Sequence, residues 1–251
     1  MKKFIKNLFI FLVIFITLLL LGMRYIGTKN IVINSYYYKN NLPEDVKNFN
    51  ILYFGDVNYS YTFLMKDLDE LKNKINYLEP DIIIFGGNLL TNKLNSKEEE
   101  KLINKLKEIN SKHIKYYIKG VNDIKESKDI LDKAGFIELD SSKEIYTKNN
   151  NKLVISPSND IKDESNIIVL NNLDNINKLP KKNLLVLTSS TYGGLIRLPK
   201  YCLFKFNNGK KYCKRELNIN NNYIINTSGL GTYKVPFRLF NHPRIEFIRL
   251  F

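Results

Sequence analysis

The sequence predicts a layered α/β fold that follows an N-terminal membrane anchor. Three observations lead to this prediction: a charge-free apolar run near the N-terminus, strands and helices that alternate through the first half, and mainly strands in the second half. Alternation of this kind favours sheets covered by helices, with sites at the carboxyl ends of strands. We expect an anchor at residues 1–27 and one domain at residues 28–251, because 251 residues suit one large α/β domain.

The apolar run extends from Leu8 to Met23, 16 residues without a charge, after a leader that contains Lys2, Lys3 and Lys6. As a helix it is about 24 Å long, close to the ~30 Å hydrocarbon core of a bilayer, and neighbouring apolar residues extend it. A cleaved signal peptide is the alternative, but the run ends in Gly22-Met23-Arg24-Tyr25 without a small-x-small cleavage site. We therefore expect a single-pass anchor in the lipid of the cell membrane, with the N-terminus cytoplasmic and the domain on the extracytoplasmic face.

Local apolar patterns predict the elements of the domain. Asn50–Asp56 has the pattern of a buried strand that ends in a turn. Thr62–Leu78 has the apolar spacing of an amphipathic helix, which Pro80 ends. The further elements expected are an extended stretch at Asn30–Tyr38, helices at Ser96–Asn110 and Ser127–Ala134, and strands at Asp81–Phe85, Ile114–Ile118, Lys152–Ile155, Ile167–Leu170, Leu184–Leu187, Tyr223–Ile225 and Ile245–Arg249. Each strand of the first half ends in a turn with Gly or Asp, where we expect the chemistry.

The chain carries a net charge of +14, from 39 basic and 25 acidic residues. A basic surface attracts anionic lipid headgroups, anionic polymers or nucleic acid. The basic residues are mostly scattered lysines without aromatic stacking platforms, which is typical of a solvated surface. A nucleic-acid partner is therefore not expected.

Two cysteines, Cys202 and Cys213, lie 11 residues apart across a polar Asn207-Asn208-Gly209 turn. In an oxidising compartment they could close a hairpin as a disulfide, and two free thiols are the alternative. A pair with this spacing does not by itself form a zinc site.

Three segments carry a resemblance to a known family. They are Ile75–Asp81, Gly193–Pro199, and Ser228–Thr232 followed by Pro236–Leu239. In their order and spacing, the chain after residue 30 resembles the membrane-anchored branch of the calcineurin-like metallophosphoesterases. The resemblance implies a layered α/β/β/α sandwich and a site in which two divalent metals (Mn, Fe or Zn) hydrolyse phosphate esters.

A site with two metals needs a bridging carboxylate, neutral imidazoles and an amide oxygen. At the family's motif positions this chain has other residues. Asp-x-His reads Asp56-Val57-Asn58, Gly-Asp reads Gly87-Asn88, Gly-Asn-His-Asp reads Gly120-Val121-Asn122-Asp123, the histidine after the Ile167 strand reads Asn171, and Gly-His-Thr-His-Gly-Gly reads Ser189-Ser190-Thr191-Tyr192-Gly193-Gly194. Among the ligand positions only Asp56 keeps a ligand-type residue, and His113 and His242 lie elsewhere.

The resemblance therefore implies a pseudoenzyme that needs no cofactor and acts as a binding or scaffold domain for an anionic ligand or a protein. Arg197 and the backbone amides of Gly193 and Gly194 are the expected anion-binding groups. The alternative is an active phosphoesterase with a reduced ligand set, in which Asp56, Asp123 and asparagine amides hold Mg²⁺ or Ca²⁺. A serine nucleophile is not favoured, because the chain has no Gly-x-Ser-x-Gly elbow.

Overall fold

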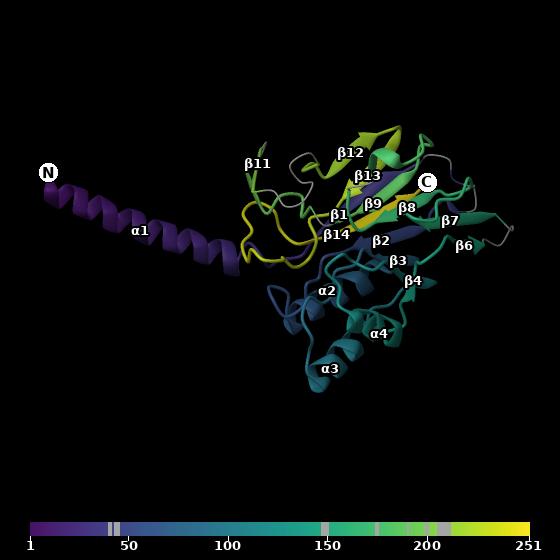
Figure 1. Cartoon of the computed structure of the whole chain (residues 1–251), viewed down its shortest axis with the longest axis horizontal. Coiled ribbons are helices and arrows are strands. Elements are labelled where there is room, and N and C mark those ends of the chain that lie inside the picture. Colours follow the sequence, from purple (N-terminus) through teal and green to yellow (C-terminus); the bar gives the residue numbers. More distant parts are fainter. Residues whose placement is uncertain are drawn as a thin grey trace.

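A computed structural model shows a mixed α/β protein with a long N-terminal helix that projects from two facing sheets (Figure 1). It describes all residues except 40–41, 43–45, 147–150, 174–175, 190, 199–200 and 205–211. The expected α/β class is therefore confirmed, with mostly parallel strand pairs in both large sheets.

The first sheet has the strand order β1-β14-β2-β3-β4-β5. Its strands are β1 (Val32–Tyr38), β14 (Arg244–Leu250), β2 (Asn50–Phe54), β3 (Ile82–Phe85), β4 (Ile114–Tyr117) and β5 (Ile137–Glu138). The strands from β2 to β5 are parallel, whereas β14 runs antiparallel to β2 and parallel to β1. The carboxyl ends of β2, β3 and β4 therefore meet at one edge of the sheet.

The second sheet has the order β12-β13-β9-β8-β7-β6. Its strands are β12 (Glu216–Ile219), β13 (Asn222–Asn226), β9 (Leu185–Thr188), β8 (Ile167–Leu170), β7 (Lys152–Pro157) and β6 (Lys143–Tyr146). The four central strands are parallel, and β12 and β6 are antiparallel strands at the edges. A separate antiparallel pair, β10 (Ile196–Leu198) with β11 (Tyr201–Phe204), follows β9.

Three helices cover the outer face of the first sheet (Figure 1). They are α2 (Met65–Leu78), α3 (Ser96–Lys107) and α4 (Lys125–Lys133), each close to its expected position. Asn95 caps α3 by accepting a hydrogen bond from the backbone N–H of Glu98 at 2.9 Å. The apolar stripes of the helices pack on Leu52 and Ile83 of the sheet, so amphipathic periodicity alone fixes which helix face is buried.

The two sheets pack face to face through a second apolar core, which contains Ile84 of the first sheet and Ile155 of the second. The outer face of the second sheet differs from the expected α layer. In the described part of the chain it carries the 3-10 helix η2 (Ile176–Lys178). Leu173, Ile176 and Leu179 recur at three-residue spacing, which suits a 3-10 turn rather than an α-helix.

Helix α1 (Lys2–Tyr25) is long and apolar enough to span a membrane, and its apolar window is not buried in the protein. Its last turn is attached to the domain, because Met23 is buried and its carbonyl accepts a hydrogen bond from the backbone N–H of Arg238 at 3.1 Å. The C-terminal end of α1 is therefore fixed to the loop that precedes β14.

Cys202 and Cys213 form a disulfide, with their Cα atoms 6.5 Å apart, which decides between the two expected states. The bond joins β11 to the segment that precedes β12. The polar turn expected at 207–209 lies outside the described residues.

We expect the double variant Cys202→Ser/Cys213→Ser to lose about 2–3 kcal/mol of unfolding free energy, because the bond restricts a short loop in the unfolded chain. Guanidinium unfolding of the full chain in a neutral detergent measures the loss. Dithiothreitol should bring the native chain to the same midpoint and leave the variant unchanged. Equal midpoints for the native and variant chains under oxidising conditions would contradict the prediction.

Candidate functional site

The strand-end turns bring most of the expected site residues together at the carboxyl edges of the sheets. Asp56 follows β2, Asn88 follows β3, Asn122 follows β4 and Tyr192 follows β9. Asp56 and Asn88 are fully buried, and Tyr192 is 2% exposed. The predicted cluster therefore forms, although it is a packed polar core rather than an open cleft.

A chain of hydrogen bonds occupies the centre of this cluster. The side-chain amide of Asn88 donates from Nδ2 to Oδ1 of Asp56 at 2.6 Å. Its Oδ1 accepts from the backbone N–H of Asn122 at 2.9 Å. At the position where the resembled family has a second carboxylate, this chain has Asn88, whose neutral amide donates to the Asp56 carboxylate.

The second contact across the cluster joins Asn58 and Tyr192. Nδ2 of Asn58 donates to the Tyr192 hydroxyl at 3.3 Å, and Oδ1 of Asn58 is buried without a hydrogen-bond partner. Burial, and then the nearby charge of Asp56, raise the pKa of Tyr192 well above its ordinary value. The phenol therefore stays protonated at neutral pH and does not supply an anionic oxygen.

Asp123 has a structural role in this arrangement. Its carboxylate accepts backbone N–H groups from Gly120 at 2.8 Å and from Asn88, Leu89 and Leu90 at 2.8, 2.6 and 3.2 Å. Burial raises the pKa of Asp123, and the N–H donors oppose that increase. The side chain joins the turns after β3 and β4, so its oxygens face peptide groups.

Asn171 bridges two further turns. Its Nδ2 donates to the carbonyl of Gly86 at 2.7 Å, and its Oδ1 accepts from the backbone N–H of Val121 at 3.1 Å. The Val121 side chain is 62% exposed and contributes only its backbone. Ser190, the remaining expected position, lies outside the described residues.

Backbone strain marks the same positions. Asp56, Asn58, Asn88 and Tyr192 have φ angles of 52°, 43°, 62° and 54°, in the left-handed region that disfavours residues with a side chain. Each such residue costs roughly 1–3 kcal/mol, and strain of this kind clusters at functional sites. Gly229 (φ 68°) packs against the Asp56 turn, and a side chain does not fit there, because a Cβ on residue 229 would lie 2.7 Å from Cβ of Asp56. The backbone of these loops is therefore strained and tightly packed.

A fully buried arginine supports these loops. The Nη2 of Arg238 donates to the carbonyls of Ser228 and Gly231 at 2.8 and 2.7 Å, and its Nη1 donates to that of Asn241 at 3.2 Å. Burial lowers the pKa of Arg238 to about 10, so it remains charged at neutral pH. The sequence analysis noted the segment that contains Arg238 without assigning this role, since no local pattern distinguishes it from a surface arginine.

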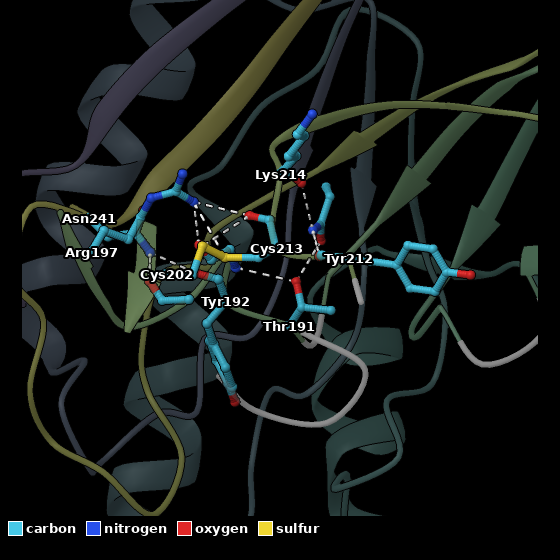
Figure 2. Close-up of a disulfide and its surroundings, with 11 residues drawn as sticks. Thr191, Tyr192, Arg197, Cys202, Tyr212, Cys213, Lys214 and Asn241 are labelled. Carbon is cyan, nitrogen blue, oxygen red and sulfur yellow. Dashed lines mark hydrogen bonds between the residues drawn. A yellow bond between two sulfur atoms is a disulfide. The ribbon is translucent and has the colours of Figure 1, made fainter. Parts of the chain in front are cut away.

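Figure 2 shows the loop that holds the expected anion-binding residues. Arg197 directs Nη1 to the carbonyls of Gly193 and Cys213, the latter at 3.0 Å. The amides of Gly193 and Gly194 donate inside the loop, to the hydroxyl and the carbonyl of Thr191. The two glycine amides expected to bind an anion are therefore already hydrogen-bonded, and Arg197 uses its Nη1 on the carbonyls of the same loop.

The donors in the cluster do not fit the dinuclear metal site of the resembled family. One carboxylate, Asp56, is present among neutral amides, and Asp123 is held by backbone N–H groups. His113 pairs with Asp81 at 3.9 Å and His242 lies near the carbonyl of Lys29, so both are outside the cluster. In the described residues no group of three or more His, Cys, Asp or Glu is placed to hold a metal.

We expect Asp123→Asn to lower the free energy of unfolding by about 2–3 kcal/mol, because an amide NH₂ would then face backbone donors that lose their acceptor. The exposed Asp129 of α4 provides the matched control, and Asp129→Asn should leave stability within error. Guanidinium unfolding of the full chain in detergent measures both. Equal midpoints for Asp123→Asn and Asp129→Asn would show that Asp123 does not hold the turns together.

The sequence matches no protein-family model, and no curated protein matches it. The resemblance to the calcineurin-like metallophosphoesterases thus depends on the motif positions of this chain and on the order of its elements.

Proposed function

We propose that this protein is a membrane-anchored, non-catalytic binding protein built on a degenerate metallophosphoesterase-like frame. The observation that carries the proposal is the 2.6 Å hydrogen bond from Asn88 to Asp56. A dinuclear site would place cations between carboxylates at this point. Here an amide donor satisfies the carboxylate directly, and the interaction needs no metal.

The charge of the cluster supports the same proposal. Two divalent cations bring four positive charges, which anionic ligands must offset. Asp56 accepts from the Asn88 amide, Asp123 is used by four backbone donors, and the Tyr192 phenol is neutral. The alternative of an all-oxygen Mg²⁺ or Ca²⁺ site is less favoured, because it needs the Asp123 oxygens that already accept four N–H groups.

The architecture supports an inherited frame. Two facing sheets, helices on one outer face and strained turns at the strand ends are the arrangement expected of a layered α/β/β/α phosphoesterase sandwich with a reduced outer layer. The four left-handed residues at these turns support the same frame, because strained backbone of this kind clusters at functional sites.

Exposed apolar side chains at the base of α1 support attachment to a membrane. Tyr201 and Leu203 of β11 and Phe240 are 68%, 60% and 66% exposed. Strand β10 pairs with β11 and also forms a bridge to Leu239. Arg238, which precedes Leu239, donates its backbone N–H to Met23 at the end of α1. Figure 1 places β11 at this end of the domain. Aromatic and aliphatic residues there suit the bilayer interface, and the disulfide suits an extracytoplasmic compartment.

We expect the full chain, produced with supplemented manganese, iron and zinc and purified in a neutral detergent, to hold much less than one metal ion per chain. Inductively coupled plasma mass spectrometry measures the content. Close to two ions per chain, together with phosphodiester hydrolysis that is lost in Asp56→Ala, would instead establish the active-enzyme alternative.

We also expect Asn88→Asp to lower the melting temperature at pH 7 without metal, because two carboxylates would lie at hydrogen-bond distance without a cation between them. Acidic pH or millimolar Mn²⁺ should restore part of the loss, since a shared proton or a cation relieves the repulsion. Asn104→Asp, on the exposed face of α3, is the matched control and should show neither effect. A metal-free Asn88→Asp chain as stable as the native one would contradict the proposed role of the Asn88 amide.

A further inference from the structure

Three arginines from separate segments gather behind the Gly193 loop: Arg197, Arg215 and Arg244, called here the arginine cluster. The disulfide at Cys213 brings the chain beside Arg197, whose Nη1 bonds the Cys213 carbonyl. The Arg215 carbonyl accepts from the Asn226 N–H at 2.7 Å, and the Arg244 N–H donates to the Gly229 carbonyl at 3.2 Å. Arg215 and Arg244 thus lie along the same segment that follows β13.

The charges of this cluster are only partly balanced in the described part of the chain. Arg244 is 7% exposed, and the Nε atoms of Arg215 and Arg244 are buried without a hydrogen-bond partner there. Glu246, two residues along β14, is the carboxylate that acts on Arg244, and one carboxylate offsets at most one of the three positive charges. Unpaired buried charge is among the costliest features that a fold can hold.

The arginines also repel one another. Burial lowers the pKa of Arg197, and the charge of Arg215 lowers it further. Burial and the same neighbour lower the pKa of Arg244 to about 10, which still leaves it charged at neutral pH. Three guanidinium groups therefore share one nearby carboxylate, Glu246, in the described residues, and the region keeps an excess of positive charge.

We propose that Arg197, Arg215 and Arg244 form a binding site for a phosphate group, with Arg244 at its floor and the half-buried Arg197 and Arg215 at its rim. Guanidinium groups present paired N–H donors that match phosphate oxygens, and a phosphate offers enough oxygens and charge for more than one arginine. The inference names the ligand class of the proposed binding function and in that sense rests on it, but the site itself depends only on the arginines and not on the Asp56 cluster.

Two kinds of molecule carry a phosphate group that this site would bind: a lipid with a phosphate headgroup and a soluble phosphate ester. Arg197 belongs to β10, next to the exposed Leu198 and Tyr201 at the anchored end of the domain. Arg197 also donates its backbone N–H to Leu239, which follows the residue bonded to the anchor. A headgroup at the bilayer surface and a phosphate from solution would use the same donors.

Thermal unfolding of the full chain in a neutral, phosphate-free detergent tests the site, with inorganic phosphate as the probe against sodium chloride at equal ionic strength. We expect phosphate at 100-fold its Kd to raise the melting temperature by roughly 5 °C. Arg244→Gln should lose this response, because it removes the buried guanidinium of the proposed site. Arg249→Gln, an exposed arginine on the same strand, should respond like the native chain.

The proposal would be overturned if phosphate raised the melting temperature of Arg244→Gln as much as that of the native chain. It would also be overturned if neither inorganic phosphate nor anionic lipid raised the melting temperature of the native chain. If Arg244→Gln does not fold, Arg215→Gln replaces it and should weaken phosphate binding at least tenfold, measured by titration calorimetry. Arg215 is only half-buried, so its substitution does not remove core packing.

Nanodiscs distinguish the two sources. Stabilisation of the native chain, but not of Arg244→Gln, by phosphatidylglycerol over phosphatidylcholine identifies a headgroup as the ligand. Stabilisation by inorganic phosphate alone identifies a soluble phosphate, and the absence of both effects overturns the site. A metal content near two ions per chain would overturn the non-catalytic role while leaving the phosphate response intact, so the two failures are distinguishable.

Discussion

The turns at the carboxyl ends of the strands depend on the hydrogen bonds that the buried guanidinium of Arg238 donates. Its bonds to the carbonyls of Ser228, Gly229 and Gly231 fix the turn after β13. The Gly231 N–H donates to the backbone carbonyl of Asp56 at 2.7 Å, and the backbone N–H of Arg238 donates to the carbonyl of Met23 in α1. Arg238 therefore joins α1, the loop before β14 and the strained turn after β2, through its peptide group on one side and its guanidinium on the other. Carbonyl groups replace water around both Nη atoms, which lowers the cost of burying the charge.

The cluster around Asp56 is held together by hydrogen bonds among its own polar groups. The amides of Asn88 and Asn58 donate to Asp56 and Tyr192, and neighbouring turns hold the strained backbone. Such a cluster is stable only when nearly all its polar atoms have partners. The buried Oδ1 of Asn58, which has no partner among the described residues, is the exception in that arrangement.

Two treatments of buried positive charge occur close together in this protein. Both Nη groups of Arg238 are satisfied by carbonyls, so Arg238 belongs to the framework. Arg244 is almost as buried, its Nε has no hydrogen-bond partner in the described residues, and Arg215 repels it while Glu246 attracts it. The two arginines differ in their Nη groups, because for Arg238 alone of the pair the described residues supply carbonyl acceptors. This difference is the reason for proposing the binding role for the arginine cluster rather than for the Asp56 cluster.

The sequence by itself determined the long apolar helix at the N-terminus, the order of the main strands and helices, and which residue types follow each strand, because apolar periodicity and residue type are local properties. It missed β6, β10, β11 and β12, which are short strands at edges or outside the large sheets, where little apolar surface is buried. Only the tertiary structure decided that Asn88 donates to Asp56, that the cysteines pair, and that the Arg197 side chain reaches the Cys213 carbonyl. These contacts join residues far apart in the chain, and strand order and loop closure, rather than any local pattern, bring them together.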